Sequence, residues 1–105
     1  MSLRITSSDF DEKVNGSEKI VLVDFYSDSC VPCKMLSPVL SQLEQEYADI
    51  LDIYKVNAPY EPELAGRFDI QASPTLIFFR NGNEAGRIRG AVKKPDIIAE
   101  LDRIR

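Results

Sequence analysis

Hydrophobic and polar residues follow two different periods along the chain, and each change of period predicts a change of secondary structure. The segment 19–27, KIVLVDFYS, is a continuous run of β-branched and aromatic residues, which is typical of a strand covered on both faces. The segments ILDIYKVN (50–57) and TLIFF (75–79) predict two further strands, and LRI (3–5) predicts a short one. The aromatic pairs in these runs are expected in the core: Phe25-Tyr26 and Phe78-Phe79.

Helical spacing appears in two longer segments. From Val31 to Tyr47 apolar residues recur every three or four positions, and Pro32 stands where the first turn of a helix tolerates proline. Pro38 lies inside this segment, and we expect it to kink the helix because it lacks a backbone donor. Residues 95–104 repeat the helical period and predict an amphipathic helix near the end of the chain.

Shorter helices and a hairpin complete the expected pattern. The segment PELAGRF (62–68) predicts a short helix, and another is expected near the start of the chain, capped by Ser8 or Asp9. The dipeptide Asn81-Gly82 is a strong hairpin signal, so the segment EAGRIRG that follows is expected to return antiparallel. Strands that alternate with helices favour parallel pairing through right-handed crossovers, and the predicted fold class is α/β.

Length, composition and charge limit the possible partners. A chain of 105 residues fits a single domain spanning 1–105, and 44% hydrophobic with 29% charged residues is typical of globular proteins. The net charge is −4 and the basic residues do not cluster beyond Lys93-Lys94, so nucleic acid is not an expected partner. No apolar run approaches the roughly 20 residues of a membrane span, and no signal-peptide pattern is present. We therefore expect a cytoplasmic protein, although a chain trimmed of its signal peptide would read the same way.

The only two cysteines, Cys30 and Cys33, lie in SDSCVPCKM between the first long strand and the long helix. A structural zinc site needs about four Cys or His ligands, and the sequence has no histidine, so a metal would need carboxylates or a second subunit. The missing histidine also removes the Cys–His pair of cysteine proteases. A static disulfide across so short a loop would add little stability. Redox exchange is the interpretation that remains.

The position of the cysteine pair supports thiol chemistry. Cys30 falls at a predicted helix N-terminus, where the helix dipole and unpaired backbone amides stabilise a thiolate. Cys33 lies one turn further on, near enough to attack a mixed disulfide on Cys30 and release the partner in reduced form. The C-x-x-C spacing alone is moderately specific, and its place between a buried strand and a helix makes the signal stronger.

The segments VLVDFYSDSCVPCKMLSP, ASPTLIFFRNG and GRIRGA resemble thioredoxin along nearly the whole chain, in the same order and at similar spacing. The resemblance implies the thioredoxin fold, a central mixed sheet of about five strands flanked by about four helices. It also implies a monomer that reduces protein disulfides through a redox-active Cys30–Cys33 disulfide, with Cys30 as the nucleophile and Cys33 as the resolving thiol. No bound cofactor or metal is expected, and electrons would come from NADPH through a flavoprotein similar to thioredoxin reductase.

Asp24 interrupts the apolar strand, where an ionised carboxylate is costly unless it is paired or protonated. One interpretation is a solvated strand end. The resemblance implies the other, a buried acid behind the cysteines that accepts the proton of Cys33 through water. Lys55, in the neighbouring strand, matches the family's lysine near that acid and would tune it, although a plain surface lysine fits nearly as well.

Several further residues are expected to bind the substrate. Taken alone, Pro74 in ASPTL would be a trans proline at the start of an edge strand. The resemblance implies a cis proline that packs against the disulfide and exposes the backbone of Ser73, with which an extended segment of the partner can pair. Gly90 would form the groove beside the cysteines through close backbone approach. Val31 and Pro32, between the cysteines, complete this set.

Four positions depart from the usual thioredoxin pattern. Thioredoxins usually carry Trp directly before the first cysteine and Gly directly after it, where this chain has Ser29 and Val31. Tyr26 stands where a second Trp is usual, and Pro59 where Asp is common. These changes keep open a partner-specific thioredoxin-like protein and a disulfide oxidase or isomerase on the same fold. A binding module without turnover is disfavoured by the intact cysteine pair and by Asp24.

Overall fold

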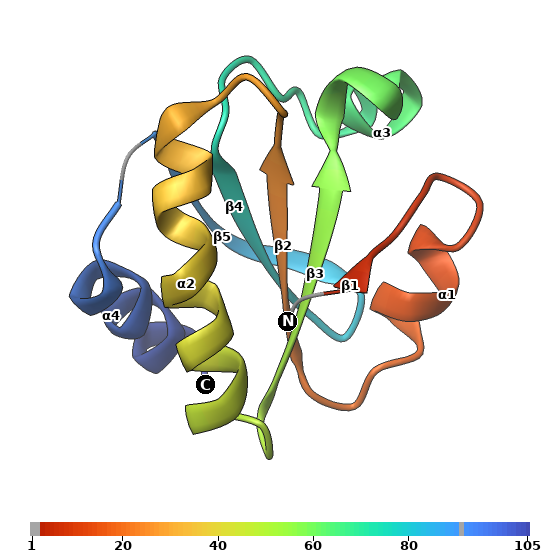
Figure 1. The fold of residues 1–105 in the computed structure, drawn as a ribbon. Helices are drawn as coiled ribbons and strands as arrows, with labels where there is room; N and C mark the ends of the chain where they lie inside the picture. Colours follow the sequence, from red (N-terminus) through yellow and green to blue (C-terminus); the bar gives the residue numbers. More distant parts are fainter. Residues whose placement is uncertain (1–2, 91) are drawn as a thin grey trace.

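Five strands form one mixed sheet in the order β1-β3-β2-β4-β5 within the computed structural model, which describes residues 3–90 and 92–105 (Figure 1). β2 pairs parallel with β3, β3 pairs parallel with β1, and β4 pairs antiparallel with β2 and β5. The predicted mixed sheet is therefore confirmed. The strands are β1 (Leu3–Arg4), β2 (Ile20–Tyr26), β3 (Leu51–Asn57), β4 (Thr75–Arg80) and β5 (Asn83–Arg89).

The described part of the chain contains four α-helices and one short 3-10 helix, of which all but the last α-helix lie between strands, and the predicted helices are confirmed. The turn after β3 forms the 3-10 helix η1 (Ala58–Tyr60), which the hydrophobic pattern does not reveal because it is only three residues long. None of the described helices is long and apolar enough to cross a membrane. The α-helices are α1 (Phe10–Asn15), α2 (Val31–Glu46), α3 (Pro62–Arg67) and α4 (Lys94–Ile104).

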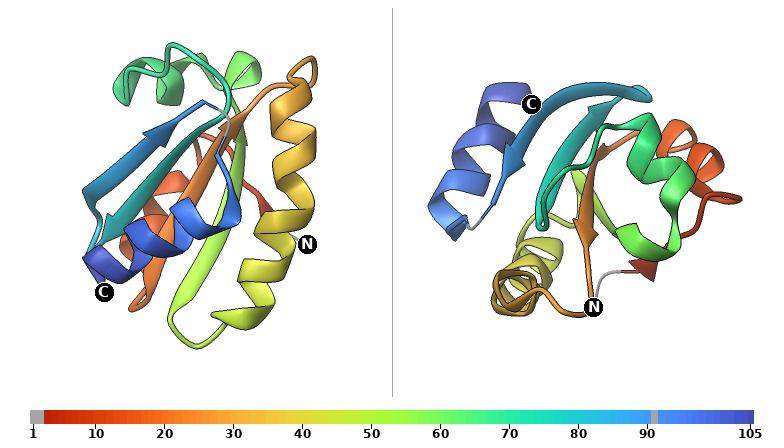
Figure 2. Two further views of the ribbon diagram at one scale, coloured as in Figure 1. Left: turned by 90° about the vertical axis from the view of Figure 1, so that its left-hand side faces the viewer. Right: turned by 90° about the horizontal axis from the view of Figure 1, so that it is seen from above.

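The helices cover both faces of the sheet, as the two views of Figure 2 show. α2 and α4 pack on one face, where the leucines of α2 meet Leu22 of β2 and Ile53 of β3. α1 and α3 cover the other face together with Val21, Val23 and Phe25 of β2. Because successive strand residues point to opposite faces, Asp24 projects on the Leu22 side, beneath α2.

The hairpin between β4 and β5 follows the prediction. Asn81 and Gly82 both adopt positive φ, 53° and 80°, as a tight two-residue turn between antiparallel strands requires. Pro38 lies inside α2, and the kink expected there remains a prediction.

Two expectations need correction. Asp9 occupies the N-cap position of α1, but its carboxylate does not cap the helix; it accepts the backbone N–H of Thr6 at 2.6 Å and so fastens the preceding turn. Phe25, Phe78 and Phe79 are core residues, whereas Tyr26 is only half-buried, because β2 ends at this residue and its ring reaches the surface.

Candidate active site

The cysteine pair lies at the start of α2, just beyond the carboxyl end of β2. This end of α2 is at the top of Figure 1. Cys30 is the N-cap residue with extended backbone, and Cys33 is one turn inside the helix. The two form a disulfide with their Cα atoms 5.2 Å apart. The backbone N–H of Cys33 donates to Cys30 Sγ at 3.2 Å. An amide of the first helical turn, which has no carbonyl partner within the helix, thus points at that sulfur. This geometry stabilises negative charge on Cys30 when the disulfide opens.

The two sulfurs differ in their access to solvent. Cys30 is partly exposed, whereas Cys33 is only 4% exposed. Cys30 is therefore the sulfur that a disulfide of another protein can approach more readily. The structure therefore gives the two cysteines the unequal access that a nucleophile and a resolving thiol require.

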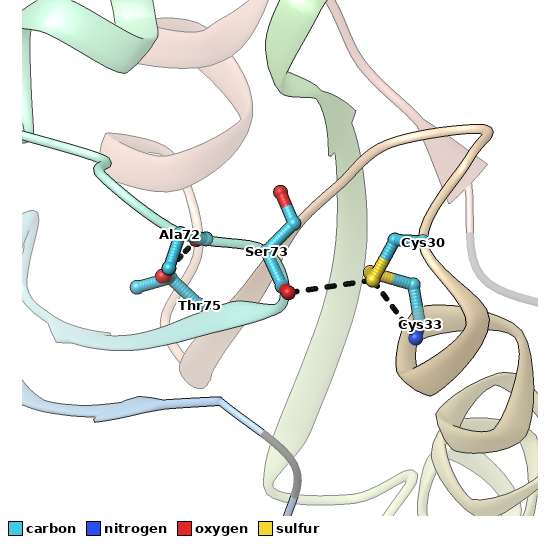
Figure 3. Close-up of a disulfide and its surroundings, with 5 residues drawn as sticks. All are labelled: Cys30, Cys33, Ala72, Ser73 and Thr75. Carbon is cyan, nitrogen blue, oxygen red and sulfur yellow. Dashed lines mark hydrogen bonds between the residues drawn. A yellow bond between two sulfur atoms is a disulfide. The ribbon is translucent and has the colours of Figure 1, made fainter.

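The loop before β4 faces Cys30 across a narrow gap. The Ser73-Pro74 peptide bond is cis, and the carbonyl oxygen of Ser73 lies 3.4 Å from Cys30 Sγ (Figure 3). Thr75 is buried and its hydroxyl donates to the carbonyl oxygen of Ala72 at 2.7 Å, which closes the loop around the cis bond. Sequence reasoning missed Thr75, although a hydroxyl in an otherwise apolar strand start is a readable signal.

A groove of about 710 Å³ opens beside Cys30. It brings together three of the residues expected to bind substrate, namely Ser73, Val31 and Pro32, and it includes Ser29 and Pro59. Pro74 is buried behind the groove, and neither it nor Gly90 lines it. The remaining lining consists of Ser27, just before the cysteines, and of residues from η1, α3 and the loop before β4 that are distant in sequence: Ala58, Ala65, Ile70, Gln71 and Ala72.

Gly90 supports the site in a different way from the one expected. A Cβ at this position would meet no atom within 4 Å, so close backbone approach is not what requires glycine here. The residue instead has a φ of +81°, a conformation that costs little for glycine alone. Its N–H donates to the carbonyl oxygen of Pro74 at 2.8 Å, which ties the end of β5 to the cis-proline loop.

Asp24 is completely buried on the α2 side of the sheet, and the solvated strand end is therefore wrong. Within the described residues, neither of its carboxyl oxygens has a hydrogen-bond partner. Burial raises the pKa of this carboxyl to about 7, and the positive charge of Lys55 partly opposes the shift. The carboxyl can accordingly hold or release a proton near neutral pH.

A second pocket, of about 340 Å³, has Cys33 in its lining. Lys55, directly across from Asp24 in the register of β2 and β3, forms part of its wall. Lys55 is thus close to the buried acid and is not the plain surface lysine that its sequence position also allowed. The full lining is Tyr26, Ser27, Asp28, Cys33, Lys34, Ser37 and Lys55.

Comparison with known proteins agrees with this geometry. A family model described as Thioredoxin matches residues 1–103. The chain is 39% identical over 100 residues to a thioredoxin of Mycobacterium bovis, and the match covers 95% of this chain and 86% of that protein. It is 35% identical over 99 residues to Thioredoxin 1 of Synechococcus elongatus, covering 94% and 92%. It is 37% identical over 99 residues to a chloroplastic M-type thioredoxin of Pisum sativum, of which it spans only 58%.

Proposed function

The chain belongs to the thioredoxin family of thiol–disulfide oxidoreductases, and on that premise we propose that it reduces protein disulfides through Cys30 and Cys33. The observation that carries the proposal is the asymmetry of the pair. A partly exposed sulfur faces an open groove at a helix N-terminus, a buried sulfur lies one turn further along the helix, and a buried acid lies on the side of the sheet that this helix covers.

The first step begins with the reduced protein. The Cys30 thiolate attacks one sulfur of the partner's disulfide, the partner's S–S bond breaks, and a mixed disulfide forms between Cys30 and the partner. The other partner sulfur leaves as a thiolate and takes a proton from water. The groove supports this step because an extended segment of the partner can lie along Ser73 while its disulfide approaches Cys30 in line.

The second step releases the partner. Cys33 gives its proton to Asp24 through water in the pocket beside Lys55, and the Cys33 thiolate attacks Cys30 Sγ. The mixed disulfide breaks, the second partner sulfur leaves and is protonated, and the Cys30–Cys33 disulfide forms. Two electrons pass from this protein to its partner. A carboxyl with a pKa of about 7 is well matched to accepting a thiol proton at neutral pH.

The oxidised pair must be reduced again before another turnover. We propose a flavoprotein reductase similar to thioredoxin reductase as the electron donor, with NADPH as the primary reductant, and no cofactor held by this chain. We propose that the protein acts as a monomer, because the sulfur must stay open to folded partners. A reducing compartment such as the cytoplasm fits this direction of electron flow.

Val31 provides a reason to keep a second candidate. Its side chain is 64% exposed beside the redox pair, and residues between the cysteines influence the relative stability of thiolate and disulfide. A pair that is poised to oxidise would make the protein a disulfide oxidase or isomerase instead.

A redox titration of the Cys30–Cys33 pair distinguishes the two candidates. The protein is equilibrated in glutathione and dithiothreitol buffers, and the fraction of disulfide is measured by alkylation and mass spectrometry. We expect the pair to stay oxidised in all but strongly reducing buffers, because a low potential favours donation of electrons to partners. A midpoint in the range of the glutathione buffers would support the oxidase or isomerase and overturn the reductase.

A further inference from the structure

Tyr26 connects two cations on the pocket side of the redox pair. Lys55 Nζ lies 4.8 Å from the centroid of the Tyr26 ring, within the range of a cation–π contact. The guanidinium of Arg4 donates to the hydroxyl of the same tyrosine at 3.4 Å. The ring thus has one cation over its face and another at its hydroxyl.

The strand register places these residues in a row that ends at Asp24. Arg4 of β1 is paired with Lys55 of β3, and Lys55 is paired with Asp24 of β2. Side chains at paired positions of neighbouring parallel strands point to the same face, so all three lie on the α2 side of the sheet. Tyr26 follows Asp24 by two positions on β2 and shares this face.

Lys55 is held in this row by the ring and not by an ion pair. Among the salt bridges found between described residues, none includes Lys55. A lysine side chain has four flexible carbons and a strongly hydrated head, so without a contact its ammonium moves toward solvent. The ring face removes that freedom and keeps the charge near the buried carboxyl.

We propose that Tyr26 is a positioning residue for thiol exchange, whose ring holds the Lys55 ammonium beside Asp24 while Arg4 holds the ring. The proposal rests on the function proposed above, because it assigns a way to set the proton affinity of the acid used there. It also gives a role to one of the four positions at which this chain departs from the usual pattern.

Few other charged groups lie near enough to Asp24 to change its proton affinity. The register partner of Asp24 on β4 is the uncharged Leu76, and the buried residues of α2 are the uncharged Cys33, Leu36, Leu40 and Leu43. Asp28 and Lys34 line the pocket on its exposed side, where solvent screens their opposite charges. Lys55 is the charge that acts most strongly on the Asp24 carboxyl.

The test is the titration of Asp24 in the oxidised protein, followed by carbon NMR of its labelled carboxyl group. Tyr26→Leu removes the ring, and we expect the Asp24 midpoint to rise by roughly half a pH unit, about a threefold weaker acid. Tyr26→Phe is the matched control, because it keeps the ring face and loses only the Arg4 contact, and its shift should be smaller. If Tyr26→Leu does not fold, Tyr26→Met provides a flexible non-aromatic replacement.

The same substitution in a Lys55→Met protein distinguishes positioning of Lys55 from a packing effect of the Tyr26 ring. In Lys55→Met, the Tyr26→Leu change should leave the Asp24 midpoint unmoved, since no ammonium is left to position. An equal shift in both backgrounds, an unchanged midpoint in Tyr26→Leu, or a fall caused by water entry would each overturn the proposal. The titration needs no turnover, so a positive result combined with unaltered insulin reduction would instead contradict Asp24 as the proton acceptor.

Discussion

The two sides of the redox pair are built differently. The groove beside Cys30 is formed by loops together with η1, α3 and the start of α2, and none of its described lining residues is charged. The pocket beside Cys33 is formed by β2, β3, α2 and the loop between β2 and α2, and its lining includes the charged residues Asp28, Lys34 and Lys55. Of the four departures from the usual thioredoxin pattern, Ser29, Val31 and Pro59 line the groove. Only Tyr26 belongs to the pocket. We infer that partner choice has changed in this chain while proton handling has kept its main residues.

The difference between the two sides also has an energetic meaning. In the groove, Ser29, Val31 and Pro59 are exposed, so replacing them changes contacts with partners and has little effect on folding. The pocket side includes a buried carboxyl with no hydrogen-bond partner among the described residues, which destabilises the fold whenever it is ionised. Substitutions at the exposed groove positions should therefore change the rate of disulfide exchange alone. Substitutions on the pocket side should change both that rate and the stability of the fold.

The largest expected effect separates the two sulfurs. Cys30→Ser should abolish insulin reduction, because Cys33 is too buried to replace it. Cys33→Ser should still attack substrates and accumulate mixed disulfides through Cys30, visible as a mass increase on non-reducing analysis. In the reduced wild-type protein, brief alkylation at neutral pH should modify Cys30 first. Preferential modification of Cys33 in peptide mass spectra would reverse the assigned roles.

Replacement of the buried acid should give the next largest effect. Asp24→Asn removes the proposed proton acceptor while keeping the size of the side chain, so release of the reduced partner at pH 7 should slow by roughly tenfold or more. The same variant should unfold at a higher denaturant concentration than the wild type at pH 8, because a neutral amide is less costly to bury than a carboxylate. Rapid-mixing kinetics and urea unfolding measure the two quantities. Unchanged release together with lower stability would indicate a structural role for the carboxyl.

The pH dependence of that stability difference has a definite sign. Below about pH 3.8 the Asp24 carboxyl is protonated in both the folded and the unfolded protein, so it does not favour either state. As the pH rises toward 7, the unfolded chain loses the proton while the folded protein keeps it, and the wild type loses stability relative to Asp24→Asn. Above about pH 7 the difference in free energy of unfolding between Asp24→Asn and the wild type is constant, and the pKa shift accounts for at most on the order of 4 kcal/mol of it. A difference that grows as the pH falls would contradict a raised pKa.

The sequence was sufficient for most of the fold because its strands and long helices have strong hydrophobic periods. β2, β3 and α2 were predicted to within about two residues, which is the usual uncertainty of element boundaries. The shortest features were harder. The side chain of Asp9 has two competing uses, capping a helix or fastening a turn, and the backbone conformation of the turn from Thr6 to Asp9 decides between them.

Prediction of the site was less complete, because most of its residues come together through the tertiary fold and not through local sequence pattern. Cys30 and Cys33 are adjacent on one helix turn, so spacing alone brought them together. The groove residues Ile70 and Ala72 reach the site only through the fold, and no local period marks them or the buried Thr75 that bonds to Ala72. Tyr26 was assigned to the core because an aromatic residue in a buried strand usually lies there, and the end of β2 is what exposes it.

The smallest expected effect tests whether the groove selects partners. Ser29 offers little apolar contact area to a docking protein, and the exposed methyl groups of Val31 stand beside the sulfur that must be approached in line. Ser29→Trp combined with Val31→Gly should restore a flat apolar surface and clear that approach. We expect the rate of insulin reduction to rise several-fold, with little change for a small aromatic disulfide.

The comparison depends on the ratio of the two rates, measured with reduced dithiothreitol as the common electron source. A small disulfide contacts only the sulfur and its immediate neighbours, whereas a folded substrate must also lie along Ser73 and the groove wall. A change that alters docking therefore changes one rate, whereas a change in the intrinsic reactivity of Cys30 changes both. An equal increase on both substrates would mean that Ser29 and Val31 act on the chemistry of the cysteine pair. In that case the groove residues would act on the same chemistry as the pocket residues, and the inferred change in partner choice would have no support.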